Sequence, residues 1–347
     1  MSIFPTKESY RKAWDEAYTQ DPPVPLNLDI ELASTCNAAC PFCLYGDRDW
    51  NQSMLEPDWD GGKKRRLMPK EMAFQLIDEA ARLGIPAIKF NFRGESLLHK
   101  DYGDIVEYAR GKIHDPEGWA RFGSVAGGRA GEYKFYDLIA NTNGNAPEAN
   151  WDSAIRGLMA CTKVAISLDS LIPETYAKVR PKLSLESACR TIDELVRRGH
   201  PDLWVRRVVC KSNKDEPFVA EARARWPNGV RVSEHAAFDR SHYAREELTG
   251  EDHLTWERTY CGYPSQRIVL EASGRYVPCC IAWSGEFDAG TWPGLSLKDY
   301  WASEWRRNLA QELRAGVFKN DKCQNCTSFL AYKRPERAFV QDVEAKA

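Results

Sequence analysis

The sequence predicts an α/β fold in which six strand–helix units form an open partial barrel. Apolar strand-like segments alternate with amphipathic helical segments between residues 25 and 245, a pattern typical of parallel sheets with right-handed crossovers. Six units are too few to close the eight-unit barrel. Polar motifs follow the predicted strands, at the carboxyl ends where parallel α/β sheets bind their ligands.

Each unit is recognised from a short apolar run and the helical stretch that follows it. The predicted strands lie within 26–32, 87–92, 135–140, 164–169, 203–209 and 230–232. The predicted helices lie within 69–84, 102–109, 152–160, 185–198 and 218–226. In the first of these helices apolar residues recur at helical spacing, and the helix ends at Gly84, a common helix stop.

The 347 residues are enough for one large and one small domain. We expect a lead-in at 1–24, the barrel at 25–245 and a small α+β domain at 246–347, with insertions at 47–66 and 111–133. The net charge of −2 does not favour a nucleic-acid partner. No apolar run approaches the length of a membrane span, and the first residues do not resemble a signal peptide.

The chain contains eleven cysteines. They cluster in CxxxCxxC and CxxC patterns, which indicate metal–sulfur sites in a reducing compartment rather than disulfides. We therefore expect a cytoplasmic protein.

The first cysteine set is Cys36, Cys40 and Cys43, directly after the first predicted strand. Three thiolates can bind three irons of a [4Fe–4S] cluster and leave the fourth iron open to another molecule. A zinc site is the alternative, but zinc sites usually close with four ligands in CxxC pairs, and no fourth ligand lies in this loop. With Phe42 before the last cysteine, the loop resembles the signature of the radical S-adenosylmethionine (SAM) superfamily, which implies that SAM binds the open iron.

The resemblance also implies SAM contacts at the following strand ends. The sequence Arg93-Gly94-Glu95-Ser96 is similar to the Gly-Gly-Glu-Pro turn of the family and departs from it at the first and last positions. There Gly94 lets the backbone approach a ligand, and Glu95 would accept the methionyl ammonium group of SAM; a helix N-terminus would explain Glu95 too. Asn143 lies in a sequence similar to the Thr-Asn-Gly of the family and would contact SAM or substrate, although turn chemistry explains it equally well.

Ser167 and Asp169 end the fourth predicted strand on one face and resemble the position where the family contacts ribose. Arg180 resembles the arginine of the family's Arg-Pro sequence and would grip the SAM carboxylate; a surface ion pair is the alternative. Asn213 follows the fifth strand and fits the same face.

The substrate side is expected at the last strands. Glu234 and His235 end the sixth strand and are candidates for a catalytic base, although a lone histidine is more often structural. Cys210, at the end of the fifth strand, could return a hydrogen atom to the substrate, which would make the enzyme an epimerase.

The second cysteine set is Cys261, Cys279, Cys323 and Cys326. Four thiolates can close a second [4Fe–4S] cluster or hold zinc. Their arrangement around a hairpin, a helical stretch at 297–313 and a final CxxC is similar to the Twitch domain, a shortened relative of the SPASM domain. No cysteine follows Cys326, so the resemblance implies one auxiliary cluster, with Cys280 as a spare or alternative ligand.

The whole pattern resembles most closely the Twitch dehydrogenases of aminocyclitol and aminoglycoside pathways. This implies oxidation of a small sugar- or cyclitol-like substrate, with the auxiliary cluster as electron acceptor and a flavodoxin or ferredoxin as reductant. The epimerase remains an alternative. A peptide maturase is another, but such enzymes commonly carry a peptide-recognition domain, for which residues 1–24 leave no room. The last alternative is a non-catalytic Fe–S or zinc protein.

Overall fold

The computed structural model describes residues 3–46, 48–53, 64–112, 135–236, 260–280, 282, 287–324 and 326, so most of both predicted insertions lies outside the described residues. The strands are β1 (Asn27–Ile30), β2 (Ala87–Lys89), β3 (Asp137–Thr142), β4 (Lys163–Ser167), β5 (Leu203–Val209), β6 (Val230–Ala236), β7 (Arg267–Leu270) and β8 (Tyr276–Val277). The α-helices are α1 (Lys7–Glu16), α2 (Arg48–Ser53), α3 (Lys70–Leu83), α4 (Tyr102–Arg110), α5 (Trp151–Ala160), α6 (Pro173–Val179), α7 (Leu185–Arg197), α8 (Phe218–Arg225), α9 (Tyr263–Gln266), α10 (Leu297–Ala302), α11 (Glu304–Arg314) and α12 (Asp321–Gln324).

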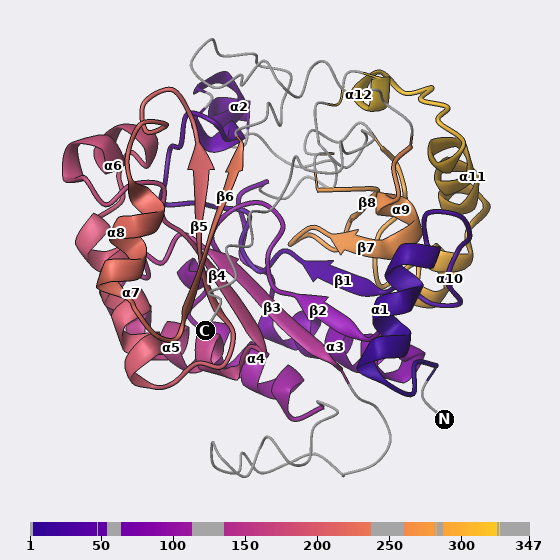
Figure 1. Cartoon of the computed structure of the whole chain (residues 1–347). Helices are drawn as coiled ribbons and strands as arrows, with labels where there is room; N and C mark the ends of the chain where they lie inside the picture. The colour runs from indigo at the N-terminus through magenta and orange to yellow at the C-terminus, as the bar shows by residue number, and fades with distance from the viewer. Residues whose placement is uncertain are drawn as a thin grey trace.

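One sheet organises the described chain, with the strand order β6-β5-β4-β3-β2-β1-β7-β8 (Figure 1). Strands β1 to β6 pair in parallel with their sequence neighbours. Helices α4 to α8 lie along the outside of this curved sheet, and α10 to α12 lie beside β7 and β8 (Figure 1). The predicted partial barrel of six parallel strands is confirmed.

The carboxyl-terminal part is joined to the barrel through the sheet itself. Strand β7 pairs in parallel with β1, from Asn27↔Arg267 to Ile30↔Leu270, and β8 pairs antiparallel with β7. The sequence predicted that the alternation of strands and helices would stop here and that a hairpin would precede Cys279, but not that the hairpin would pair with β1. Pairing with β7 covers an edge of β1 that would otherwise expose unpaired backbone groups.

The two faces of the sheet differ in chemistry because side chains alternate along each strand. One face packs against the helices and forms the main core, with Leu28, Ile30, Ile88, Leu138, Ala140, Val164, Ile166, Leu203, Val205, Val232, Ile268 and Leu270. The alternate positions face the inside of the barrel and are mostly polar: Asn27, Asp29, Lys89, Asp137, Asn141, Lys163, Ser167, Arg206, Ser233 and Arg267. The inside of the barrel therefore offers polar groups rather than an apolar core.

The lead-in is a helix, α1, which begins with a capping box between Thr6 and Ser9. Its Lys7 and Arg11 bind Asp137 at the start of β3, with N–O distances of 2.6 and 3.4 Å. Helix α1 thus lies at the amino-terminal end of the barrel strands, opposite the end where the polar motifs lie.

Three predicted elements differ from the structure. Strand β6 continues to Ala236, four residues beyond the predicted 230–232. Strand β3 lies two residues later than predicted, and the helical stretch predicted from 297 to 313 is divided into α10 and α11. Ser303 ends α10 in an extended conformation, and its hydroxyl accepts a hydrogen bond from the amide of Arg306 (3.2 Å), so that it caps α11. Among the described helices, none is both long enough and apolar enough to cross a membrane.

Candidate active site

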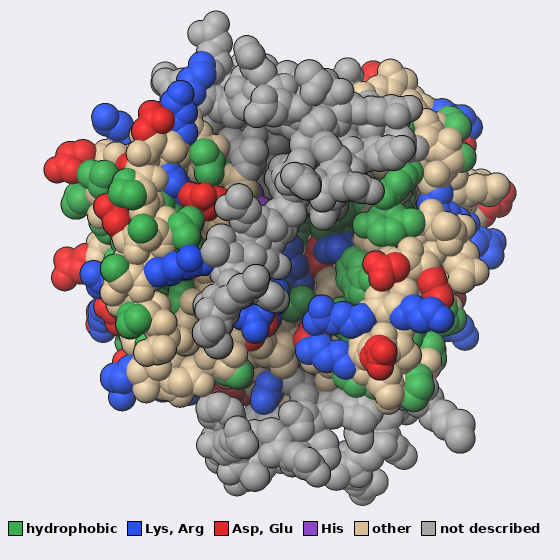
Figure 2. Space-filling view, in the orientation of Figure 1, with side chains coloured by type: hydrophobic (Ala, Val, Ile, Leu, Met, Phe, Trp, Pro, Cys, Tyr) green, Lys and Arg blue, Asp and Glu red, His purple; other side chains and the backbone are tan. Residues whose placement is uncertain are grey.

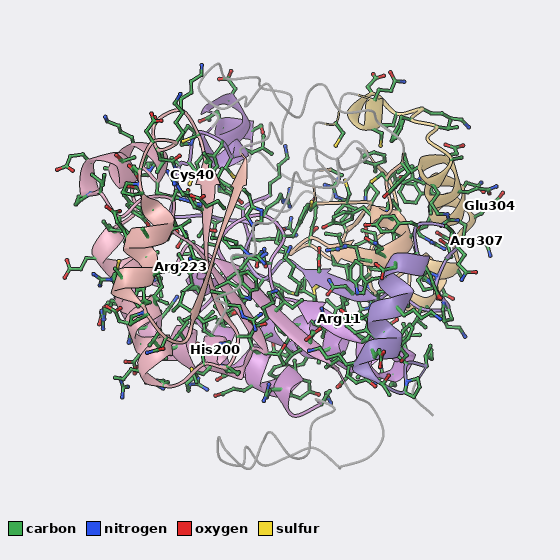
Figure 3. The ribbon with its side chains drawn as sticks, viewed as in Figure 1. Arg11, Cys40, His200, Arg223, Glu304 and Arg307 are labelled. Atoms are coloured by element: carbon green, nitrogen blue, oxygen red, sulfur yellow. The ribbon has the colours of Figure 1, made fainter. Side chains whose placement is uncertain are left out.

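The first cysteine loop follows β1 at the carboxyl end of the strands, where Figure 3 shows Cys40 beside the tips of β5 and β6. Tight turns fold the loop, since the amide of Cys43 donates to the carbonyl of Cys40 (3.0 Å) and Gly46 donates to Cys43 (2.8 Å). Cys40 is buried, and Cys36 and Cys43 are half-buried against Leu44 and Tyr45. All three thiols therefore belong to one compact, largely apolar site.

Burial disfavours free thiolates at this site. It raises the pKa of Cys40 to about 11 despite the opposing charge of Arg180, and it raises the pKa of Cys36 far above its usual range, helped by the charge of Glu95. Iron–sulfur clusters bind thiolates, and coordination deprotonates the thiol. Three thiols in one largely apolar loop, of which only Cys40 has a neighbouring cation, fit such a cluster.

Gly94 brings the turn after β2 against the start of the cysteine loop. The amide of Glu95 donates to the carbonyl of Thr35 (2.8 Å), and Gly94 has a φ of +63°. A Cβ atom at Gly94 would lie 2.1 Å from the carbonyl oxygen of Ala33. Glycine is therefore required by the approach of two backbone segments, and Ser96 closes the same turn by donating its hydroxyl to Phe90.

Glu95 is a buried carboxylate, 3% exposed. It accepts hydrogen bonds from the hydroxyl of Thr142 (2.7 Å) and the amides of Asn143 (2.8 Å) and Leu97 (3.1 Å), the last as the cap of a short 3-10 helix. Burial raises its pKa, while these hydrogen bonds lower it. Within the described residues no lysine or arginine lies at ion-pair distance, so the site suits an ammonium group such as that of SAM.

Arg180 is buried and forms no surface ion pair, so that alternative is wrong. Its Nε donates to the buried carboxylate of Asp169, its Nη1 lies 3.5 Å from the sulfur of Cys40, and its guanidinium lies 5.1 Å from the ring centroid of Phe42. The other oxygen of Asp169 accepts from the amide of Val208 (2.7 Å). Arg180 therefore positions the cysteine loop against β4 and β5, and its grip on the SAM carboxylate stays a prediction.

Two buried asparagines connect strand ends. Asn143 donates to the side chain of Asn37 in the cysteine loop (2.8 Å). Asn213 donates to the carbonyl of Asp169 (2.8 Å) and accepts from the amide of Cys210 (2.8 Å). Both residues thus shape the site, and their contacts with SAM stay predictions, as does the ribose contact of the half-buried Ser167.

The expectation that Glu234 and His235 both line the substrate side needs correction. Adjacent strand residues point to opposite faces, and Glu234 binds Arg207 (2.6 Å), whose guanidinium lies over Phe218 of α8 on the helix side. His235 faces the inside, with its Nε2 3.4 Å from the hydroxyl of Ser233. Of the two, only His235 stays a candidate base.

Cys210 is buried in an apolar group with Val179, Phe42 and Val208. Burial raises the pKa of its thiol. It therefore lies beside the cysteine loop, and its role as hydrogen donor stays a prediction.

The second cysteine set surrounds a cavity. Its walls include the thiols of Cys261, Cys279, Cys323 and Cys326, together with apolar side chains such as Phe287. Burial raises the pKa of Cys261 to about 12, and the neighbouring thiols add to the shift. In the part of the chain that the structure describes, no three metal-binding side chains converge closely enough for a single ion. Four thiols around a space fit a larger group such as an iron–sulfur cluster.

Cys280 packs against the same apolar group as Cys261, Cys279 and Cys323. This group includes Tyr263, whose hydroxyl donates to Asp29 on the inside of the barrel (3.1 Å). In this arrangement Cys280 is not among the residues that line the cavity.

Residues between the two cysteine sites escaped the sequence analysis. Phe92 packs both against the apolar group at Cys36 and Cys43 and against the group at Cys261 and Cys279. A single aromatic side chain therefore packs against the apolar groups of both sites.

The neighbouring Arg93 is buried between two carboxylates. It lies 2.8 Å from Glu31 at the end of β1 and 3.3 Å from Glu271 at the end of β7, and Glu31 also accepts from the amide of Ala272 (2.9 Å). This network connects the turn that holds Glu95 to the carboxyl-terminal part. The departure of Arg93 from the glycine of the family was the only sequence signal for it.

Comparisons with known proteins agree with this geometry. The radical SAM superfamily profile matches residues 30–223, and the profile of the SPASM iron–sulfur cluster-binding domain matches residues 261–327. A probable GTP 3′,8-cyclase of Methanosarcina acetivorans is 25% identical over 207 residues, 59% of this chain and 52% of that protein. The GTP 3′,8-cyclase of Synechocystis is 22% identical, covering 88% of this chain and 83% of that protein. Mycofactocin maturase MftC of Mycolicibacterium smegmatis is 27% identical, covering 60% and 44%.

The chain thus spans about half the length of the first of these relatives. Among solved structures, BtrN in complex with AdoMet and 2-DOIA superposes with a TM-score of 0.54 at 16% identity, over 92% of this chain and 99% of that chain. Native anSMEcpe with bound AdoMet superposes with a TM-score of 0.56 at 14% identity, over 89% and 88%. At these identities the superpositions show a shared fold.

The cofactors follow from the two matched domains: SAM, a [4Fe–4S] cluster that binds it, and an auxiliary iron–sulfur cluster. The thiol sites and the buried Glu95 are chemically suited to these groups. The chain belongs to the radical SAM superfamily and is a SAM-dependent iron–sulfur enzyme with a carboxyl-terminal SPASM domain.

Proposed function

We propose that this enzyme oxidises an alcohol of a small sugar- or cyclitol-like substrate to a ketone, with the auxiliary cluster as electron acceptor. The observation that carries the proposal is the cavity lined by four thiols. Four cysteine ligands leave a [4Fe–4S] cluster no open iron. Such a cluster suits electron transfer better than it suits anchoring a substrate.

When bound, the first cluster supplies the electron that cleaves SAM, and the resulting 5′-deoxyadenosyl radical removes one hydrogen atom from a substrate C–H bond. The oxidation is complete when the substrate also loses one electron and its hydroxyl proton. Two hydrogens thus leave the alcohol, one as an atom and one as a separated electron and proton. His235, on the inner face of β6, is our candidate for the base that takes the proton.

Phe92 packs against the apolar groups beside both cysteine sets, which supports a short path between the SAM site and the acceptor. We further propose a flavodoxin or ferredoxin as the reductant. A cytoplasmic location follows from the same proposal, because the cysteines must remain reduced to bind iron.

A peptide is the second candidate substrate, because the sequence match to a mycofactocin maturase covers 60% of the chain. Supplying the reconstituted enzyme with short peptides and with aminocyclitols, in parallel, separates the two candidates. Our proposal requires consumption of SAM to depend on the small alcohol.

The test uses anaerobically reconstituted enzyme, dithionite, SAM and aminocyclitols deuterated at their ring carbons. We expect deuterium in 5′-deoxyadenosine and one ketone per SAM cleaved. Cys210→Ala should leave this reaction intact, because oxidation needs no hydrogen donor. A product of unchanged oxidation state in which a ring deuterium has been replaced by solvent hydrogen, lost in Cys210→Ala, would instead identify an epimerase and refute the proposal.

A further inference from the structure

Four exposed lysines lie around the first cysteine loop. Lys178 is in the last turn of α6 and Lys182 follows that helix, while Lys211 and Lys214 lie in the turn between β5 and α8. All four residues are exposed. Figure 2 shows lysine and arginine side chains at the edge of the molecule where Figure 1 places α6 and the end of β5. We call these four residues the lysine patch.

The two turns that carry the lysine patch meet at the cysteine loop. In the turn after α6, the carbonyl of Pro181 accepts a hydrogen bond from the amide of Ala39 (3.3 Å). Val179 at the end of α6 and Cys210 at the end of β5 belong to one apolar group, against which Phe42 packs. Both turns therefore touch the loop that carries the cysteines of the first cluster.

The distance from the lysine patch to the first cluster site is short. The buried Arg180 precedes Lys182 by two residues, and its Nη1 lies 3.5 Å from the sulfur of Cys40. Two residues of chain span about 7 Å at most. The rate of electron transfer falls steeply with distance, so an electron carrier bound at this surface would be well placed to reduce the first cluster.

Lys182 has an unusual backbone conformation. Its φ is +71°, and among the described residues it is the one residue other than glycine with a positive φ. This left-handed region is unfavourable for most residues that have a Cβ atom and favours glycine or asparagine. Such outliers often lie at functional sites, and here the outlier is a lysine beside the cysteine loop. The conformation indicates that the side chain of Lys182 serves a purpose other than folding.

The amino groups of the lysine patch have no acidic partners in the structure. The acids nearest to them in sequence are Glu174, Glu186 and Asp215, which are also exposed. Within the described residues, no carboxylate lies at ion-pair distance from any of the four lysines. The four charges are therefore available to carboxylates of another molecule, and a surface of this kind accelerates the association of an oppositely charged partner.

We propose that the lysine patch is the docking surface for the acidic electron-transfer protein that reduces the first cluster. This inference rests on the proposed function, in which such a protein is the reductant, and it names the surface that receives it. The carrier loses one electron and the cluster gains it, and no atom is transferred. Ammonium groups that face the carboxylates of the carrier would hold its cofactor close to the cysteine loop.

The first test measures binding of oxidised flavodoxin, an acidic electron-transfer protein, to the reconstituted holoenzyme by calorimetry at low ionic strength. We expect saturable binding that Lys182→Glu with Lys211→Glu weakens by about tenfold or more. The difference should shrink as KCl screens the charges. The matched control is Lys298→Glu with Arg307→Glu, at exposed positions of α10 and α11 on the opposite side of the molecule (Figure 1). This control changes the net charge equally and should bind as the wild type does.

The second test measures the rate of SAM cleavage, which reports electron transfer to the first cluster because SAM binds there. With limiting reduced flavodoxin, Lys182→Glu with Lys211→Glu should form 5′-deoxyadenosine about tenfold more slowly than the wild type. With reduced methyl viologen, a cation that lysines do not attract, the two rates should be equal. Lys182→Gly should also slow the flavodoxin reaction, although its melting temperature should not fall because glycine suits a positive φ.

Each of four results would overturn the proposal: no saturable binding of flavodoxin, equal binding by the patch variant and the wild type, an equal loss in the control on α10 and α11, or slower SAM cleavage with methyl viologen as well. The last result would assign the lysines to the cluster site itself. Iron content and melting temperature establish that each variant is folded, and Lys182→Gly serves where Lys182→Glu is not. If flavodoxin binding depends on the lysine patch but no aminocyclitol is oxidised, the proposed function fails while the docking surface stands.

Discussion

Replacing Arg93 with methionine tests whether a buried ion network stabilises the junction between the two cysteine sites. Arg93→Met would leave Glu31 and Glu271 charged at 0% and 2% exposure. Removing one partner of a buried ion pair costs about 3–5 kcal/mol. Glu271 keeps Arg275 at 2.7 Å, so we expect a loss at the lower end, about 3 kcal/mol. At about 2 °C per kcal/mol for a chain of this size, the melting temperature should fall by about 6 °C.

The assay is thermal unfolding of the anaerobically reconstituted protein. The matched control is Arg156→Met, because Arg156 also binds two carboxylates, Asp104 and Glu107, but its side chain is 44% exposed. An exposed network of this kind should contribute about 1 kcal/mol or less. The double variant Glu31→Gln with Arg93→Met should recover part of the lost stability, since it removes one unpaired charge. Equal shifts for Arg93→Met and Arg156→Met, or no recovery in the double variant, would refute the reasoning.

Three further predictions concern the turn at Gly94, the auxiliary site and acid stability. Gly94→Ala should abolish SAM cleavage, because the new methyl group would lie 2.1 Å from a carbonyl oxygen. The control is Gly199→Ala, where φ is similar but the surrounding space is open; it should lower the free energy of unfolding by about 1–2 kcal/mol and keep SAM cleavage. Equal SAM-cleavage activities of the two variants would contradict this. Cys326→Ala should lower the iron content from about eight to about four per chain and stop product formation while 5′-deoxyadenosine still forms. Burial lowers the pKa of His200 to about 4 from 6.5. Between these two pH values the histidine is protonated in the unfolded chain but not in the folded protein, so the free energy of unfolding should fall as the pH drops through this range. In urea unfolding, His200→Gln should make the free energy of unfolding depend less on pH in this range. An unchanged pH dependence would contradict the prediction.

The sequence was sufficient for the barrel because its signals are local. Each apolar run and each amphipathic helix can be recognised within about ten residues, and the strand order then follows from right-handed crossovers. The pairing of β7 with β1 could not be recognised, since it joins residues 27–30 to 267–270 and no local pattern specifies it. The break at Ser303 was missed because helical spacing continues through it.

The candidate site divides in the same way. Cys36, Cys40 and Cys43 were predicted from their spacing, but the partners of Arg180 and Arg93 lie far away in sequence and became visible only in the fold. The opposite orientations of Glu234 and His235 could have been predicted, because alternation along a strand requires them. The same alternation would have placed Lys163 on the inner face.

The most direct test of the account is the iron content and SAM cleavage of the anaerobically purified protein, measured together. The account predicts about eight irons per chain, bound as two [4Fe–4S] clusters, and 5′-deoxyadenosine on reduction in the presence of SAM. A protein that binds no iron, or that holds zinc and leaves SAM intact when reduced, would contradict it.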